Sequence, residues 1–450
     1  MRKEITRREF LRRSTATGMV VTLGPHLVAP QQPQGRTGPN DAITVGIIGS
    51  GARGQELMEA IMKIPGTEIV AVCDAYKGRV RRAIERTKGR AKDYGHYRKI
   101  LDDKSIDVVV IATPDHWHAR QAIEAMQAGK DVYIEKPLTY TIDEGVEIVK
   151  VAKSTGRILQ VGSNPMSSAI QQKAKEIVAS GRLGQITMIR AYYNRNTASG
   201  AWIYPIPPDA SPETVDWEMF LGPAPKRPFS LERFFRWRCY WDYSGGIPTD
   251  LFVHLCTSIH YVMGAKMASS AMAVGALYRW KESREVPDTV NAVLVYPEGF
   301  MVNMSTTFNN QRLGGSGFQI LGTEGSLEVA GGEIRFYPEI VHEDNGWVVR
   351  SWPRELEEAY YSDPKILAME RPETQPPQIL EAGEVYREEG IDSTLVHMQR
   401  FFESVRTRKP PVQDALMGHR AAACAHMVNL SIKTGKIVYW DFEQENVKKG

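Results

Sequence analysis

The sequence predicts an α/β fold in which a doubly wound parallel sheet is followed by an α+β domain with a large, mostly antiparallel open sheet. Three observations predict it. Apolar strands alternate with amphipathic helices from residue 43 to about residue 165. A glycine-rich turn joins the first strand to the first helix. The later strands are separated by short turns that contain glycine.

Length and charge limit the classes of protein to consider. With 450 residues and 42% hydrophobic content, the chain has room for two or three domains with real cores. We divide it into a leader and linker (1–40), a first domain (41–165) and a second domain (166–450). The net charge is +3, but residues 1–40 hold seven Lys/Arg against two Asp/Glu. The remainder is slightly acidic, which argues against a nucleic-acid partner.

The first residues indicate targeting. "TRREFLRRSTATGMVVTLGPHLVAP" resembles a twin-arginine export signal, with Arg7 and Arg8 before an uncharged segment. This resemblance predicts export by that route to the periplasm; a basic surface helix is the alternative. The apolar run is too short and too rich in Gly and Thr to span a membrane stably. "PQQPQGRTGPN" is then a linker.

The cysteines suggest no metal or disulfide site. Cys73, Cys239, Cys256 and Cys424 are far apart and show no C-x-x-C spacing. We expect buried thiols that act as small apolar residues.

The first strand and the turn after it carry the clearest motif. "ITVGIIGSGARG" ends in Gly49-x-Gly51-x-x-Gly54, and a helix with apolar residues at helical spacing follows. Such glycines allow a tight turn and a close approach of backbone to pyrophosphate, and the helix N-terminus supplies amide donors. The combination of strand, loop and helix predicts a Rossmann dinucleotide-binding domain; a purely structural turn is the alternative.

The second strand, "EIVAVCD", indicates which dinucleotide is bound. Asp74 at its end would accept hydrogen bonds from the ribose hydroxyls and repel a 2′-phosphate, which favours NAD. Lys77 and Arg79 nearby leave NADP open.

The alternation continues through the strands "DVVVIATP", "DVYIEKP" and "ILQVGSN". Ligands of parallel sheets gather at the carboxyl ends of the strands. The residues predicted at these ends are Gly49, Asp74, Thr113, Pro114, Lys136 and Asn164.

One segment carries a family resemblance. "ATPDHWHARQAIEAMQAGKDVYIEKPLT" resembles the signature of the glucose-fructose oxidoreductase / inositol dehydrogenase / rhizopine-catabolism (Gfo/Idh/MocA) group, and the resemblance extends from Ile43 to the C-terminus. It implies that Lys136 contacts the nicotinamide ribose and the reacting hydroxyl, and that the Lys136–Pro137 bond is cis. The predicted cofactor-binding residues are Gly49, Ser50, Gly51, Ala52, Arg53, Gly54, Asp74, Thr113, Pro114, His118, Glu135, Lys136 and Asn164.

A second signature, "SGGIPTDLFVHLCTSIHYVMG", supplies the other catalytic candidates. Asp250 and His254 are four residues apart, which places them on one face of a helix. A carboxylate there would orient an imidazole base and stabilise its charged form. The resemblance maps the family's catalytic Asp and His onto this pair; a surface ion pair is the alternative. We expect His260 to be structural.

The chain departs from the family at three positions. Phe252 and Thr257 stand where the family often has a glycine and an acid, and Met166 stands where it often has an arginine after Asn164. We therefore expect cofactor handling to be less affected than the substrate side.

The second domain contains a segment, 202–246, that is dense in aromatic residues, proline and arginine. Its aromatic side chains would either stack on a sugar or form a satellite core. The predicted substrate contacts are His116, Trp117, Arg238 and Tyr240. The family resemblance also implies homo-oligomer contacts through the open face of the second sheet, and the helix "DALMGHRAAACAHMVNLSIKTG" is expected to pack toward the first domain.

Three functions follow from these residues. The main prediction is an NAD(P)-dependent oxidoreductase that transfers hydride from a carbohydrate or polyol hydroxyl, with a cofactor that stays bound because no free nicotinamide pool exists outside the cell. The alternative is a redox-neutral reaction in the same cleft, above all an NAD-dependent glycoside hydrolase that works by transient oxidation and elimination. A sugar-binding or sensing protein without catalysis is the third.

Overall fold

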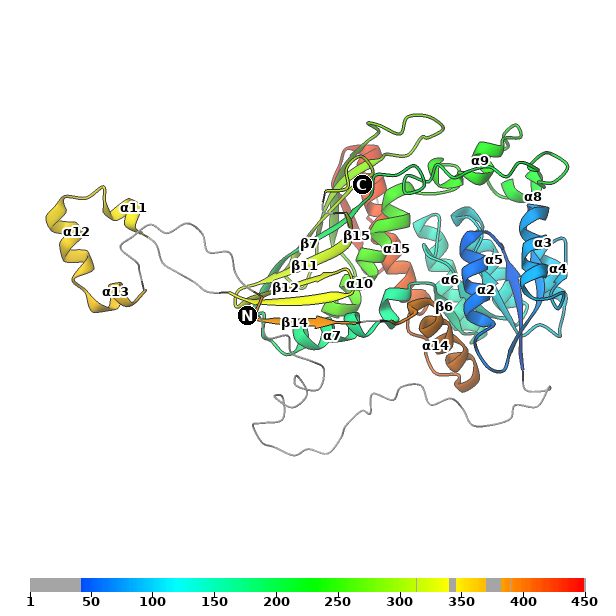
Figure 1. The fold of residues 1–450 in the computed structure, drawn as a ribbon, viewed down its shortest axis with the longest axis horizontal. Helices are drawn as coiled ribbons and strands as arrows, with labels where there is room; N and C mark the ends of the chain where they lie inside the picture. The colour runs from blue at the N-terminus through cyan, green and yellow to red at the C-terminus, as the bar shows by residue number, and fades with distance from the viewer. Residues whose placement is uncertain (1–41, 313, 340–344, 370–381, 389, 449–450) are drawn as a thin grey trace.

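The structure is a computed structural model that describes residues 42–312, 314–339, 345–369, 382–388 and 390–448. The predicted twin-arginine signal in residues 1–40 lies outside the described residues. Figure 1 shows a parallel sheet with its helices at one end of the molecule and a second sheet in the middle. The helices α11 (Gly346–Val349), α12 (Arg354–Tyr361) and α13 (Pro364–Met369) lie at the other end.

The first domain is the predicted doubly wound Rossmann sheet. Its six strands run in the order β3-β2-β1-β4-β5-β6, and every pairing is parallel. The strands are β1 (Ile43–Ile48), β2 (Thr67–Cys73), β3 (Lys92–Asp93), β4 (Val108–Ile111), β5 (Asp131–Ile134) and β6 (Leu159–Val161). The helices are α2 (Ala52–Ile61), α3 (Lys77–Arg86), α4 (Tyr97–Asp102), α5 (Asp115–Gln127) and α6 (Ile142–Thr155).

The central strands of this sheet are buried at every position because helices cover both faces, and the one charged residue among them, Asp131, is paired with Arg408. All four residues of β4 and all four of β5 are buried. Helix α6 begins at a capping box in which Thr141 and Glu144 satisfy each other's backbone groups, and it ends at Gly156 in the left-handed conformation.

The second domain is built on ten strands in the order β14-β13-β12-β11-β7-β10-β9-β8-β15-β16. Only the β7–β10 pair is parallel, so the predicted mostly antiparallel sheet is confirmed. The strands are β7 (Ile186–Asn194), β8 (Ser270–Ala276), β9 (Thr289–Val295), β10 (Met301–Thr307), β11 (Gly315–Gly322), β12 (Gly325–Ala330), β13 (Glu333–Pro338), β14 (Glu384–Arg387), β15 (Val438–Asp441) and β16 (Asn446–Val447).

Helices cover one face of this sheet. They pack on its inward side chains in one large core. The outward residues of β8, β9 and β10 alternate with them and are exposed or half-exposed. The helical elements between β6 and β8 are η2 (Asn164–Ser167), α7 (Ala169–Ala179), α8 (Trp217–Leu221), α9 (Leu231–Phe235), η3 (Trp237–Cys239), η4 (Pro248–Phe252) and α10 (Val253–Met263). Those after β13 are α11 (Gly346–Val349), α12 (Arg354–Tyr361), α13 (Pro364–Met369), α14 (Ser393–Thr407) and α15 (Ala415–Thr434).

Two late helices join the domains. Helix α15 contributes Ala421 and Met427 to the core of the second domain, while its Gly418 faces Val161 of β6, so it packs toward the first domain as predicted. Helix α14 packs directly into the first domain. Its Phe401 and Phe402 belong to the Rossmann core with the residues of β1 and α2, although they lie far beyond residue 165.

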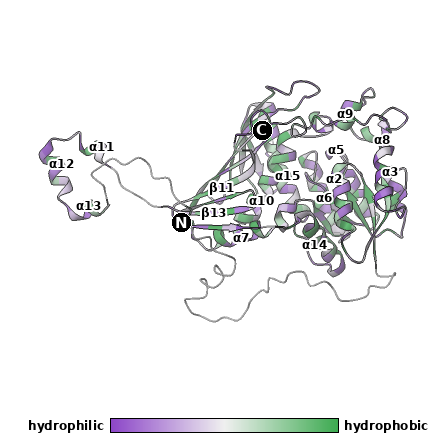
Figure 2. Cartoon of the chain, in the orientation of Figure 1, coloured by the Kyte–Doolittle hydropathy of each residue, from purple (hydrophilic) through white to green (hydrophobic). Residues whose placement is uncertain are grey.

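The aromatic segment 202–246 is largely a core in its own right. Trp202, Phe220, Phe234 and Tyr243 are each less than 5% exposed and join the core under the second sheet. Figure 2 shows hydrophobic positions in the strands of both sheets and hydrophilic positions along the outer helices. The cysteines are also buried and unpaired, as predicted.

Candidate active site

At two positions of the first loop, Gly49 and Gly54, neighbouring backbone leaves no space for a side chain. Gly49 has φ +86°, and a Cβ there would lie 2.7 Å from the carbonyl carbon of Ala112 at the end of β4. A Cβ on Gly54 would lie 2.3 Å from the carbonyl oxygen of Gly49. These contacts close the turn and bring α2 against the sheet.

Gly51 is different, because the protein leaves open space in front of it. A Cβ on Gly51 would meet nothing closer than the Arg79 guanidinium carbon, at 3.6 Å, which is ordinary contact. Gly51 caps the N-terminus of α2, followed by Ala52 and Arg53, so free backbone amides surround this space. The missing side chain leaves room for a pyrophosphate, and the loop therefore fits the predicted dinucleotide.

Asp74 is held at the end of β2. Its carboxylate accepts hydrogen bonds from the backbone N–H of Ser50 at 2.8 Å and of Tyr76 at 2.9 Å, and Arg79 Nη1 lies 3.6 Å from it. These bonds fix the acid beside the glycine loop, where a ribose would lie.

A segment of the second domain reaches this adenosine end. A cavity of about 280 Å³ is lined by the glycine loop, by Arg79 and by Asp209. The Asp209 carboxylate accepts hydrogen bonds from the Tyr76 hydroxyl and, at 2.8 Å, from Arg81 Nη2. Backbone bonds from Lys77 N to the Thr214 carbonyl (3.0 Å) and from Asp216 N to the Ala75 carbonyl (2.7 Å) hold the same segment.

The Glu-Lys-Pro turn follows β5, and its Lys136–Pro137 bond is cis, as expected. Glu135 is 6% exposed and accepts a hydrogen bond from Arg53 Nε at 2.8 Å. The two ring nitrogens of His118 lie 2.7 Å from the Pro137 carbonyl oxygen and 2.9 Å from that of Thr113. In this structure the side chains of Arg53 and His118 therefore stabilise the turn that positions Lys136.

Lys136 meets Asp250 across the two domains. Its Nζ donates to Asp250 Oδ1 and to the Asp250 backbone carbonyl, both at 2.9 Å. Arg238 Nε donates to the same Oδ1 at 3.0 Å. Burial alone would raise the pKa of Asp250, but the charges and hydrogen bonds of Lys136 and Arg238 outweigh it and hold the pKa well below its usual value.

His254 lies close to this group but is not hydrogen bonded to Asp250, in contrast to the expected orienting role of the carboxylate. The reason is that Asp250 lies in the π-helical turn η4, which precedes α10 and shifts the register between the two side chains. Burial lowers the pKa of His254 to about 3, and the charge of Lys136 adds to this effect. The imidazole is therefore neutral at neutral pH and able to accept a proton.

Three of the predicted substrate contacts have packing positions instead. His116 Nε2 and Trp117 Nε1 both lie 2.9 Å from the Phe220 carbonyl oxygen, and the two side chains are 4% and 7% exposed. Tyr240 is 6% exposed, and the Arg233 guanidinium lies over its ring at 4.2 Å. These three side chains are packed in this structure, and their contact with a substrate stays a prediction.

Three residues near Asp250 or His254 were not predicted. Asp115 is 2% exposed and accepts a hydrogen bond from Ser244 Oγ at 3.0 Å; burial raises its pKa to about 7 against the opposing charge of Arg238. Tyr204 lies near enough to Arg238 and Asp250 for their charges to act on its pKa, which burial raises. The charge of Arg195 contributes to the lowered pKa of His254.

The remaining predicted residues lie at strand ends. Thr113 Oγ1 donates to Gln121 at 2.7 Å, and Pro114 caps α5. Asn164 Nδ2 donates to Thr394 Oγ1 at 2.8 Å, which ties η2 to α14.

A second cavity lies away from Lys136, and the described residues include neither a metal-binding group nor a membrane-spanning helix. A cavity of about 350 Å³ lies between Tyr140, Trp241 and Lys433, and none of Lys136, Asp250 or His254 lines it. The described part of the chain contains no group of three or more His, Cys, Asp or Glu residues that could hold a metal ion. None of the helices described is long and apolar enough to cross a membrane.

Curated proteins resemble this chain over part of its length. The chain is 32% identical over 158 residues to inositol 2-dehydrogenase of Salmonella typhimurium, which is 34% of this chain and 47% of that protein. It is 31% identical over 210 residues to alpha-N-acetylgalactosaminidase of Shewanella oneidensis, which is 42% of this chain and 46% of that protein. The match thus spans less than half the length of these curated relatives.

Similarity to solved structures extends over more of the chain. Levoglucosan dehydrogenase in complex with NADH and levoglucosan superposes with a TM-score of 0.66 at 20% identity, over 88% of this chain and 99% of that one. At this identity the likeness shows the fold alone.

Two family models match the two domains in turn. Residues 43–163 match the oxidoreductase family with an NAD-binding Rossmann fold, and residues 171–328 match the GFO/IDH/MocA C-terminal domain. Together they extend over more than half of the chain. The chain therefore belongs to the Gfo/Idh/MocA family of oxidoreductases, with an NAD-binding Rossmann domain.

Proposed function

We propose that the protein oxidises a hydroxyl group of a carbohydrate or polyol by hydride transfer to NAD. The observation that carries the proposal is the contact of Lys136 with Asp250 at the carboxyl end of β5, beside the glycine loop. Inositol 2-dehydrogenase and levoglucosan dehydrogenase, by name, act on molecules of this class.

Each side chain has a distinct task in this reaction. NAD, when bound, supplies the hydride acceptor. Lys136 donates a hydrogen bond to the reacting hydroxyl and stabilises the negative charge that develops on its oxygen. His254, neutral at neutral pH, accepts the hydroxyl proton. Asp250 does not take the proton, because its pKa is held low; it fixes Lys136 at 2.9 Å.

The test uses the purified protein and a panel of sugars and polyols, with NADH absorbance as the readout. We expect NADH formation with at least one of them, and its loss in Lys136→Met. Lys150→Met, on the exposed face of α6, is the matched control and should behave as wild type. A Lys136→Met variant that retains full turnover would contradict the proposal.

A second candidate is a redox-neutral glycoside hydrolase. The observation in its favour is the 31% identity to an alpha-N-acetylgalactosaminidase. Transient oxidation at C3 of the sugar acidifies the C2–H, which permits elimination of the aglycone, addition of water and re-reduction. Cleavage of a nitrophenyl glycoside without net NADH formation would select the hydrolase; stoichiometric NADH would select the dehydrogenase.

We further infer that the cofactor is held tightly. Asp209, with Tyr76 and Arg81, draws a segment of the second domain onto the adenosine end, and the flanking backbone bonds at Lys77 and Asp216 support it. Tight retention suits a protein that is exported with its cofactor, which is what the leader resemblance predicts. Cofactor content after extensive dialysis, and the location of the mature protein in cell fractions, test these two points.

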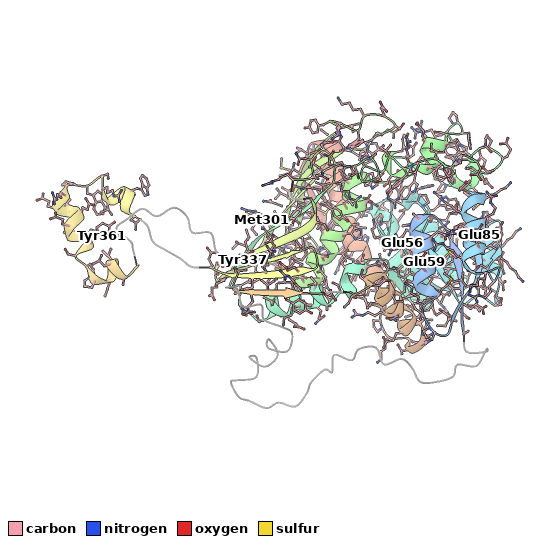
Figure 3. All side chains as sticks on the ribbon, in the orientation of Figure 1. Glu56, Glu59, Glu85, Met301, Tyr337 and Tyr361 are labelled. Atoms are coloured by element: carbon pink, nitrogen blue, oxygen red, sulfur yellow. The ribbon has the colours of Figure 1, made fainter. Side chains whose placement is uncertain are left out.

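We also propose that the exposed face of the ten-stranded sheet forms the contact between subunits of a homo-oligomer. Met272, Val274, Val293 and Met301 lie on this face with 53%, 66%, 41% and 42% of their surface exposed. Figure 3 marks Met301 on the sheet. Light scattering of wild type and of Val274→Lys would test it, because a charge in the interface should shift the molecular mass toward the monomer.

A further inference from the structure

Arg238 uses only part of its donor set within the described part of the protein. Nε donates to Asp250 Oδ1 at 3.0 Å, whereas Nη1 and Nη2 form no hydrogen bond to the described residues. Neither nitrogen is a fully buried atom without a partner, and the side chain as a whole is 25% exposed. The guanidinium carbon lies over the Trp237 ring, 4.1 Å from its centre, and this contact restrains the group. Arg238 therefore presents a fixed pair of N–H donors to a ligand.

The positive charges around the Arg238 guanidinium outnumber the negative ones. Lys136 and Arg238 share a single carboxylate, that of Asp250. Arg195 brings another positive charge close enough to act on His254. Asp115 is the other acid near Arg238, and its pKa of about 7 leaves it only partly ionised at neutral pH. A surplus of positive charge in a cleft attracts an anion and is costly if left without one.

The positions of the two cations define where that anion would lie. Lys136 Nζ and Arg238 Nε bind the same oxygen at 2.9 and 3.0 Å, so they lie within about 6 Å of each other. This is the scale of one sugar ring, whose reacting hydroxyl and a substituent could be bound together.

We propose that the substrate is a sugar acid, such as a hexuronate, whose carboxylate is bound by Nη1 and Nη2 of Arg238 while Lys136 binds the reacting hydroxyl of the same ring. This inference rests on the proposed function and narrows its substrate class. A planar carboxylate matches the two parallel donors of one guanidinium, whereas a phosphate ester would need donors around a tetrahedron.

The experiment compares D-glucuronate with D-glucose, which differ only at C6, by calorimetric titration of the full chain with its cofactor bound. We expect glucuronate to bind at least about tenfold more tightly, as a charged bidentate hydrogen bond permits. Raising the salt concentration should weaken the binding of glucuronate and leave that of glucose unchanged.

Arg238→Gln should abolish the preference. Because this change also loosens Asp250, the quantity compared is the ratio of the two affinities, which a general distortion of the cleft would leave unchanged. Arg227→Gln is the matched control: Arg227 belongs to the same segment but pairs with Asp242 at the surface, and this variant should keep the preference.

Equal affinity of the wild type for the two sugars, or an unaltered ratio in Arg238→Gln, would refute the inference. Tighter binding of glucose 6-phosphate than of glucuronate would also refute it. Calorimetry does not require turnover, so the two proposals can fail separately. NADH formation from neutral polyols without a preference for glucuronate would support the proposed function and refute the carboxylate site. Tight glucuronate binding without NADH formation would support the carboxylate site and refute the proposed function.

Discussion

Replacing Asp115 with asparagine is predicted to stabilise the protein above neutral pH. Asp115 is the first residue of α5, is 2% exposed, and has a pKa that burial raises from 3.8 to about 7 despite the nearby Arg238. Asparagine preserves the shape and can still accept the hydrogen bond from Ser244. It removes the cost of placing a charge in the interior.

The magnitude follows from the difference between the folded and unfolded pKa. Because the folded protein binds this proton more tightly, the proton contributes stability that is fully present below pH 3.8 and is lost as the pH rises to about 7. A shift of about three units corresponds to roughly 4 kcal/mol. Asp115→Asn should therefore match wild type near pH 4 and exceed its free energy of unfolding by up to about 4 kcal/mol at pH 8.

Urea unfolding followed by tryptophan fluorescence, on both proteins between about pH 4 and pH 8, measures this difference. Glu124→Gln on the same helix is an informative control. Hydrogen bonding from Arg98 lowers the pKa of Glu124 to about 2, so its charge stabilises the protein above pH 4.5 and its loss should be destabilising there. If the difference between Asp115→Asn and wild type did not change with pH, Asp115 would not titrate in this range and our reasoning would be wrong.

Four further predictions concern the cofactor and the chemistry. Gly51→Ala should leave the unfolding midpoint near that of wild type, because a Cβ there meets no protein atom closer than 3.6 Å. The same Cβ would occupy the space left for the pyrophosphate, so NAD retention measured after gel filtration should be abolished. Gly54→Ala should lower the midpoint itself, because its Cβ would lie 2.3 Å from a backbone oxygen. His254→Gln should reduce kcat by about 10²–10⁴-fold, and wild-type kcat should show no loss from protonation of this residue above about pH 4, since its pKa is near 3. Asp209→Asn should shorten the half-life of bound NAD in a fluorescence chase without a change in kcat at saturating NAD.

Most of the fold was predictable because its signals are local. The glycine spacing, the acid at the end of β2 and the alternation of strands and helices each depend on residues close together in the chain, and the sheet order confirms the Rossmann domain. The open second sheet was recognised from its Gly-containing turns.

The site was less predictable wherever it depends on distant residues. Lys136 and Asp250 are 114 positions apart, and nothing in the sequence shows that Arg238 shares the same carboxylate. The spacing of Asp250 and His254 assumed a regular α-helix, and the π-helical turn changes it. His116 has the right residue type for a substrate contact, but only the structure shows it packed against Phe220.

Helix α14 has a consequence for how the protein can be made. Phe401 and Phe402 complete the hydrophobic interior of the nucleotide domain, so a fragment that stops at residue 165 would leave apolar surface of β1 and α2 open to water. During synthesis this interior must wait until Phe401 and Phe402 have left the ribosome. Coenzyme loading would then follow synthesis of the second sheet rather than accompany the growth of the first domain.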